Sequence, residues 1–379
     1  MLLIKNATTY APKSLGIKDI LVVNGKIVAI EDEINLPDSL CNKWDAQGKI
    51  VTPGFIDQHI HITGAGGKHG FGSMTPEINC SDLVKCGSTT VVGLLGTDGA
   101  TRSIKSLFAK TRALESEGLT AYMYTGFYGL EPTFITGSLQ DDMMFIAPVL
   151  GCKVAISDIR SDYPTDLELV RLLRQIKVGG MLASKKGILH LHLGALTSKM
   201  DCLFRLVNEY EFPISAISPT HVGRTKDLFE EAIKFAALGG SIDLTTGASK
   251  YTEPYLSVLY ALEKGISLDQ ITFSSDGNAG LDKLDAQGNL IGFRRAVIDQ
   301  NYLQFKALVQ QGGVPTEQAL KVITSSPAKN LGLKNKGVIA VGTDADFCCL
   351  DEDLVLQDVI AGGKLMMENK EVLVKGHFE

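Results

Sequence analysis

Residues that can bind metal ions or move protons stand within or at the ends of short apolar segments. His59 and His61 lie two residues apart in GFIDQHIHITGAGGK, so in a β-strand their side chains point the same way. Lys153 begins a later segment of this kind, and three more such segments end in His192, His221 and Asp276. Imidazoles and carboxylates suit zinc, and two close metal ions can activate water and polarise a carbonyl together. The set predicts a two-metal site if the fold brings its members together.

Lys153 is the unusual member, because an ammonium group repels metal cations. Ala155 and Ser157 share its face of the expected strand and are small. They leave room for a lysine that has reacted with carbon dioxide to form a carbamate. A carbamate is an anion whose two oxygens can bridge two metal ions, so we expect Lys153 to be carbamylated.

The elements that must position these residues are eight short apolar runs, which alternate with amphipathic helical stretches. The runs span residues 54–61, 88–96, 120–128, 152–158, 188–194, 214–221, 241–247 and 270–278. Eight βα units predict an α/β fold of the TIM (β/α)8 barrel type, in which the carboxyl ends of the strands share one mouth. The alternative is an open doubly wound sheet, but GAGGKHGFG lacks the GxGxxG spacing of its phosphate loop.

Both ends of the chain instead contain short β-rich pieces separated by turn signals, including a hairpin signal at Asn24 and Gly25. The two ends could pair into one sheet structure that neither could build alone. We therefore predict a small β-sandwich domain from residues 1–53 plus 332–379, and a barrel domain with the metallohydrolase site over residues 54–331.

The composition of the chain limits the classes of partner and the cellular location that we expect. The 379 residues are 45% hydrophobic, with a formal net charge of -6 and charges of both signs interspersed, which argues against a nucleic-acid partner. Seven cysteines occur without a CxxC pair, as is typical of a reducing compartment. The N-terminus is charged by Lys5 and has no apolar run of the length of a signal peptide or membrane span. We expect a cytoplasmic protein without a membrane partner.

Several segments resemble the amidohydrolase superfamily and, within it, the bacterial isoaspartyl dipeptidases. They are PGFIDQHIHITGAGG, VVGLLGTDG, CKVAISDIRS, PTHVGR and SSDGN, and the resemblance extends over most of the chain. It implies a homo-oligomeric enzyme that hydrolyses the β-aspartyl (isoaspartyl) amide bond of dipeptides. It also implies two divalent metal ions, expected to be Zn²⁺, with His59, His61 and Asp276 on the first, His192 and His221 on the second, and carbamylated Lys153 between them.

The resemblance further implies the roles of residues around the metals. A hydroxide bridging the two ions would attack the amide carbon, and Asp276 would carry its proton to the leaving amine. The hydroxyl of Tyr128 would help to polarise the amide oxygen. The guanidinium groups of Arg160 and Arg224 would bind the carboxylate of the leaving amino acid. The aspartyl α-carboxylate would contact Thr97 and the backbone around Gly66.

Two neighbouring residues have more ordinary interpretations. His190 shares the face of His192 one layer deeper, and we interpret it as a core histidine. Asp57 shares the face of His59 and either orients a ligand imidazole or has a structural role.

Two departures from the family pattern affect the end of the pocket where the aspartyl group would bind. Lys68 stands where the family has a glutamate for the substrate's α-ammonium, and Ala279 or Gly280 stands where it has a serine. If Lys68 points away from the pocket, isoaspartyl dipeptides remain the expected substrates. If it points inward, we expect a substrate that is neutral or anionic there, such as an N-acylated amide.

Two other functions remain open. A cyclic-amide hydrolase of the dihydroorotase or hydantoinase type would share the metal set, although Arg160, Arg224 and the segment GLLGTDG argue against it. A catalytically silent binding protein would require the loss of ligands, and all six are present.

Overall fold

The computed structural model describes residues 1–130, 134–248 and 251–379. Its central feature is a sheet of eight parallel strands that neighbour one another in chain order. The strands are β6 (Phe55–Ile60), β7 (Ser88–Gly93), β8 (Thr120–Gly126), β9 (Val149–Ile156), β10 (Ile188–Leu193), β11 (Ile217–Thr220), β12 (Ile242–Thr245) and β13 (Ile271–Ser274). Each matches one of the eight predicted runs, and the TIM barrel is confirmed.

Strand β9 corrects one prediction. Lys153 was expected to begin this strand, but β9 begins at Val149, so Lys153 lies in its interior. Gly151 obscures the start of the strand in the sequence, because glycine weakens a strand signal. The glycine is needed here: a Cβ at position 151 would lie 1.8 Å from the carbonyl oxygen of Ile188 in β10.

The first and last strands of the barrel meet at their carboxyl ends. The amide of Asp276 donates to the carbonyl of His59 at 3.1 Å, and the amide of His61 donates to the carbonyl of Gly277 at 3.0 Å. These two bonds close the ring of strands. They also fix His59 in β6 and His61 directly after it against a third predicted metal ligand, Asp276, which follows β13.

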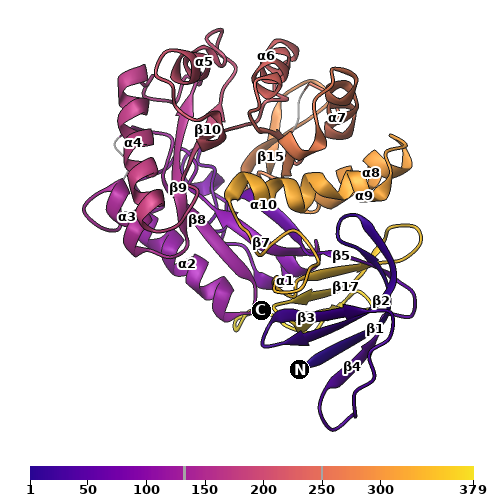
Figure 1. The fold of residues 1–379 in the computed structure, drawn as a ribbon. Coiled ribbons are helices and arrows are strands. Elements are labelled where there is room, and N and C mark those ends of the chain that lie inside the picture. Colours follow the sequence, from indigo (N-terminus) through magenta and orange to yellow (C-terminus); the bar gives the residue numbers. More distant parts are fainter. Residues whose placement is uncertain (131–133, 249–250) are drawn as a thin grey trace.

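Helices cover the outside of the barrel, as Figure 1 shows. They are α1 (Cys80–Val84), α2 (Ile104–Ser116), α3 (Leu139–Phe145), α4 (Asp166–Leu182), α5 (Asp201–Asn208), α6 (Lys226–Ala237), α7 (Pro254–Glu263), α8 (Gln300–Gln310), α9 (Thr316–Ala319) and α10 (Ser325–Leu331), with short 3-10 turns at Phe71–Ser73, Ile214–Ala216, Leu268–Gln270 and Leu320–Ile323. Side chains of Ser103, Ser138, Thr165 and Thr225 cap four of the helices. Among the residues described, none of the helices combines the length and the hydropathy needed to cross a lipid bilayer.

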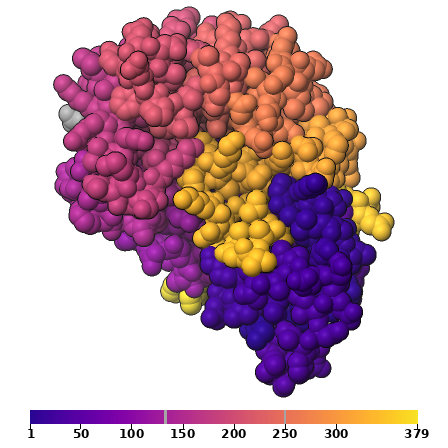
Figure 2. Space-filling view, in the orientation of Figure 1, coloured from indigo at the N-terminus to yellow at the C-terminus, as the bar shows by residue number. Residues whose placement is uncertain are grey.

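The two ends of the chain form a second, nine-stranded sheet. It contains β1 (Leu2–Tyr10), β2 (Ser14–Val23), β3 (Lys26–Glu31), β4 (Asn42–Asp45), β5 (Ile50–Pro53), β16 (Phe347–Leu350), β17 (Leu356–Ala361), β18 (Lys364–Glu368) and β19 (Glu371–Val372). Strand β16 pairs with β5, so the early and late parts of the chain lie against each other (Figure 2). The hairpin turn at Asn24 and Gly25 joins β2 to β3, with both residues at positive φ. The division into two domains at the predicted boundaries stays a prediction.

A hairpin that the sequence did not suggest follows β13. Its strands are β14 (Gly280–Leu284) and β15 (Leu290–Arg295), paired antiparallel around residues 285–289. The hairpin begins four residues after Asp276, and several of its side chains line the cavity at the barrel mouth.

Candidate metal centre and substrate pocket

A cavity of about 760 Å³ opens at the carboxyl ends of the barrel strands. Ten of the twelve predicted site residues line it: His61, Gly66, Lys68, Thr97, Tyr128, Arg160, His192, His221, Arg224 and Asp276. The other two, His59 and Lys153, are fully buried and contact this group from within the barrel. The fold therefore brings all the predicted residues to one place.

Four histidine rings form a continuous row in the barrel mouth. The ring centroid of His59 lies 5.6 Å from that of His61 and 4.9 Å from that of His221. The centroids of His221 and His192 are 4.5 Å apart. Asp276 lies against one end of the row, with its Oδ1 atom 3.1 Å from Nε2 of His61. One potential ligand atom from each of His59, His221 and Asp276 lies within 4.8 Å of the others.

The histidines are in the protonation state that metal binding requires. Burial lowers the pKa of His59 and of His192 to about 3, and it lowers those of His61 and His221 as well. For Asp276, burial opposes ionisation, but the nearby imidazole of His221 and the contacts of its Oδ1 atom with His59 and His61 hold the pKa well below its usual value. The cluster thus combines neutral imidazoles with an ionised carboxylate.

Three of the imidazole nitrogens are buried and have no hydrogen-bond partner in the described structure: Nε2 of His59, Nδ1 of His61 and Nε2 of His221. Buried polar atoms without a partner are rare, because each costs free energy. Three together, beside an ionised carboxylate, fit a site whose missing partners are metal ions.

Lys153 is fully buried beside this cluster. Its Nζ donates to the carbonyl of Leu95 at 2.7 Å and lies 5.2 Å from the centroid of the Tyr128 ring. Burial lowers the pKa of this amine to about 7; Asp276 opposes the shift and Arg160 adds to it. A substantial fraction of the amine is therefore uncharged near neutral pH, which is the form that can react with carbon dioxide.

The backbone conformation at two of the predicted ligands is unusual. His221 has a φ of 62° and Asp276 a φ of 50°, both in the left-handed region that non-glycine residues seldom adopt. Each residue follows the end of a barrel strand, and each is held there by a partner. Thr245 bonds to Nδ1 of His221, and the carbonyl of His59 accepts from the amide of Asp276. Such local strain is concentrated at functional sites.

His190 was interpreted as a core histidine, and its contacts add a role. Its Nε2 lies 2.8 Å from Nδ1 of His59, and its own Nδ1 lies 3.3 Å from the hydroxyl of Ser218. The ring of Tyr124 stacks on it at 4.7 Å. His190 therefore fixes the orientation of His59 and leaves Nε2 of His59 facing the cluster. Its spacing of two residues from His192, which repeats that of His59 and His61, was the signal available in the sequence.

The contacts of Asp57 fit a structural role rather than the orientation of a ligand imidazole. It accepts from the backbone amides of His59 and Ser275 at 3.3 and 3.2 Å and from the Ser275 hydroxyl. Burial raises the pKa of Asp57 to about 7, against the effect of these donors. The carboxyl group joins β6 to the segment after β13 rather than contacting an imidazole.

The two arginines predicted to bind a carboxylate differ in their hydrogen-bond partners. Arg160 donates through Nε and Nη2 to both oxygens of Asp158, at 2.9 and 2.6 Å. Asp158 also lies 3.0 Å from Nε2 of His192, a contact that the sequence analysis missed. By contrast, Nε of Arg224 is buried without a hydrogen-bond partner among the described residues. Arg224 is thus the more available donor for a carboxylate.

Tyr128 also contacts His192. Its hydroxyl lies 2.9 Å from Nδ1 of that ring, and both residues line the cavity. Burial raises the pKa of Tyr128 above its usual value, so the hydroxyl keeps its proton and can donate it to an oxygen.

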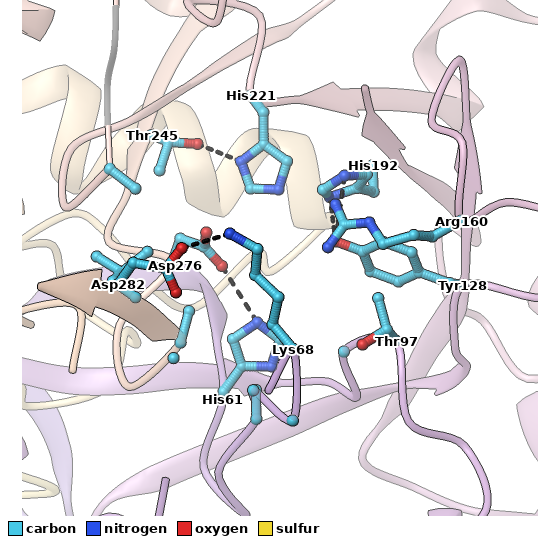
Figure 3. A pocket seen from close by; sticks show the side chains of 18 of the residues that line it. His61, Lys68, Thr97, Tyr128, Arg160, His192, His221, Thr245, Asp276 and Asp282 are labelled. Carbon is cyan, nitrogen blue, oxygen red and sulfur yellow. Dashed lines mark hydrogen bonds and ion pairs between the residues drawn. The ribbon is translucent and has the colours of Figure 1, made fainter. Parts of the chain in front are cut away.

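Lys68 extends across the cavity mouth and forms an ion pair with Asp282 of β14 (Figure 3). His69 contacts the same carboxylate, with Nε2 at 3.0 Å from Oδ1. The charge of Lys68 in the pocket is therefore compensated by Asp282, which sequence reasoning missed because the pairing spans more than two hundred residues. An inward Lys68 no longer requires a substrate that lacks a positive charge.

Gly280, one of the two residues that could stand in place of the family's serine, has a steric explanation. A Cβ at position 280 would lie 2.8 Å from the Cα of Gly66, which itself has a φ of 108°. Two backbone segments meet here without side chains between them, so a serine at position 280 would not fit this arrangement.

Comparisons with known proteins show the family of this chain. The sequence model of the amidohydrolase family matches residues 225–378. The crystal structure of a β-aspartyl dipeptidase from Fervidobacterium islandicum AW-1, in complex with β-Asp-Leu dipeptide, is 39% identical, covers 98% of both chains and has a TM-score of 0.91. A dihydroorotase of Elusimicrobium minutum is 24% identical over 92% of this chain and 88% of its own length. A dihydropyrimidinase of Brevibacillus agri NCHU1002, 18% identical over 99% and 96% of the two chains with a TM-score of 0.69, shares the fold.

A barrel of this kind, with its histidine row and this family match, defines a hydrolase of the amidohydrolase superfamily. Within the superfamily, the chain belongs to the β-aspartyl (isoaspartyl) dipeptidase family.

Proposed function

We propose that this enzyme hydrolyses the β-aspartyl amide bond of dipeptides and requires divalent metal ions, with zinc as the expected metal. The observation that carries the proposal is the likeness to a structure that holds β-Asp-Leu, at 39% identity over 98% of the chain. The free Nε of Arg224 in the same cavity suits a substrate with a terminal carboxylate.

In this proposal His59, His61, His192, His221 and Asp276 would hold two divalent metal ions, together with Lys153 as a carbamate. The partnerless nitrogens of His59, His61 and His221 and the lowered pKa of Lys153 support the assignment. When bound, the metal ions supply an activated water and a positive charge that polarises the substrate carbonyl.

The chain's own residues carry the remaining steps. The ionised Asp276 takes the proton of the attacking water and passes it to the nitrogen of the leaving amino acid. The protonated hydroxyl of Tyr128 donates to the oxygen that becomes negative. Arg224 holds the carboxylate of the leaving residue, with Arg160 beside it on Asp158.

The direct test compares β-Asp-Leu, its α-linked isomer Asp-Leu, N-acetyl-β-Asp-Leu and dihydroorotate as substrates. We expect hydrolysis of β-Asp-Leu alone, loss of that activity after treatment with a chelator, and recovery with zinc. Faster turnover of dihydroorotate would favour the activity named for the curated relative. Preference for the N-acetylated dipeptide would favour an N-acyl substrate, against which the carboxylate of Asp282 argues.

Replacing Arg224 with methionine should weaken substrate binding. A charge-assisted hydrogen bond to a carboxylate contributes about 1.5–3 kcal/mol, so we expect kcat/KM for β-Asp-Leu to fall about 10- to 100-fold, mainly through KM. Steady-state kinetics on β-Asp-Leu and on the amide of its C-terminal carboxyl provide the check. The variant should lose most of its preference for the free carboxylate, and an unchanged preference would rule out this role.

Two further parts of the proposal concern the cell and the assembly. The seven cysteines are free, six of them buried, as suits a reducing compartment such as the cytoplasm. We also propose a homo-oligomer that acts on small dipeptide-like substrates and not on nucleic acids.

A further inference from the structure

The ion pair between Lys68 and Asp282 bridges two segments that are distant in sequence. Lys68 belongs to the glycine-rich turn after β6, and Asp282 belongs to β14 of the hairpin after β13. Both side chains line the cavity, and Figure 3 shows their charged ends meeting across its mouth, on the side away from Arg160. The pair is therefore a part of the pocket wall.

Asp282 is the carboxylate of this wall that remains for a ligand. The acidic side chains among the described residues of the lining are Asp276 and Asp282. Asp276 is bound to His61 and lies against His59. The partners of Asp282 are Lys68 and His69, both on the turn after β6.

Lys68 is free to exchange partners. Its side chain is 69% exposed, compared with 22% for that of Asp282. The turn that carries it contains Gly66, Gly67 and Gly70, all at positive φ. A long exposed side chain can move at little cost, whereas the carboxylate is held by the hairpin.

A β-aspartyl dipeptide presents a matching pair of charges. Its aspartyl end carries a free α-ammonium and a free α-carboxylate on one carbon atom, so it is itself a small ion pair. A lysine and an aspartate that pair with each other in the empty pocket can instead pair with the two charges of such a group. The carboxylate of Asp282, which is only 22% exposed, then has a cationic partner in either state, which avoids the cost of leaving it unpaired.

We propose that Lys68 and Asp282 together form the receptor for the aspartyl α-amino acid group, with Asp282 accepting from the α-ammonium and Lys68 donating to the α-carboxylate. This inference rests on the proposed function and specifies how that function selects its substrate. It assigns the recognition of the positive charge to the hairpin after β13, in place of the turn after β6.

Two analogues of β-Asp-Leu separate the two contacts. Succinyl-leucine lacks the α-ammonium and keeps the carboxylate, whereas β-alanyl-leucine lacks the α-carboxylate and keeps the ammonium. In the wild type, kcat/KM for β-Asp-Leu should exceed that for each analogue by about 10- to 100-fold, as expected for one charge-assisted hydrogen bond.

Each variant should remove one preference. Asp282→Asn should bring the ratio of kcat/KM between β-Asp-Leu and succinyl-leucine close to one, through KM. Lys68→Met should do the same for the ratio between β-Asp-Leu and β-alanyl-leucine. Lys283→Met is the matched control, since this exposed neighbour on β14 lies outside the cavity lining, and it should leave both ratios as in the wild type.

The outcomes are distinct. If the pair only held the hairpin in place, both variants would lower the rates on all three substrates in proportion, and unchanged ratios would overturn the receptor. If the wild type failed to hydrolyse β-Asp-Leu at all, the proposed function would fail and this inference with it. Turnover of β-Asp-Leu with unchanged ratios would overturn the inference alone.

Discussion

The Lys153→Ala variant is expected to lose hydrolytic activity by about a thousandfold or more and to bind less metal. Metal ions contribute several kcal/mol to catalysis of this kind, and each 1.36 kcal/mol corresponds to about tenfold in rate. Lys153 is fully buried against the histidine row, and burial lowers the pKa of its amine to about 7. Its removal takes away the proposed bridge between the two ions. Metal analysis and kinetics on β-Asp-Leu provide the measurement.

Two controls separate the loss of the carbamate from a general loss of structure. Lys185 is a second lysine whose pKa is lowered by burial, to about 8, and it donates to three backbone carbonyls of residues 143, 146 and 149. Lys185→Met should keep its metal and its activity while losing some stability. Addition of a short carboxylic acid such as acetate should partly restore Lys153→Ala, because it can replace the missing anion. An alanine variant with full metal content and full activity would refute the bridging role.

Replacing Lys336 with methionine should destabilise the fold by about 3–5 kcal/mol, the effect of breaking a buried ion pair on one side. Lys336 lies before β16 and is 7% exposed. It forms ion pairs with Asp344 and Asp346 and donates to the hydroxyl of Thr120, the first residue of barrel strand β8, at 2.6 Å. The substitution would leave Asp346, also 7% exposed, without its cation.

Denaturant unfolding of the metal-free protein would measure this effect without a contribution from bound ions. Lys334→Met provides the matched control, because Lys334 lies two residues earlier and is exposed. We expect a change within about 0.5 kcal/mol there. Similar unfolding free energies for the two variants would show that the ion pairs of Lys336 with Asp344 and Asp346 do not hold the terminal sheet to the barrel.

The barrel and its mouth could be predicted because their signals are local. Each strand is a short apolar run, and a residue such as His221 or Asp276 at the end of a run must face the mouth once the runs close into a ring. The strand count and the grouping of the candidate residues follow from this repetition. An individual strand boundary is weaker, as Gly151 shows, because the reason for the glycine lies in a neighbouring strand.

The parts of the site that could not be predicted depend on contacts between distant segments. The partner of Lys68 is on a hairpin more than two hundred residues away, and neither segment carries a pattern that indicates the other. The role of His190 depends on the distance from its ring to that of His59, which sequence spacing does not give. The glycine at position 280 likewise makes sense only beside Gly66.

The pairing of β16 with β5 has a consequence for folding during synthesis on the ribosome. Strand β5 ends at Pro53 and β16 begins at Phe347, so about 290 residues separate the two. At the usual pace of synthesis, a ribosome needs roughly 15 to 60 s to deliver the second strand after the first. Throughout that time the nascent chain has an open edge on β5, which is the kind of edge that attracts other strands. The whole barrel is synthesised before the first sheet is finished, so the early strands carry an unpaired edge for most of the synthesis of this enzyme.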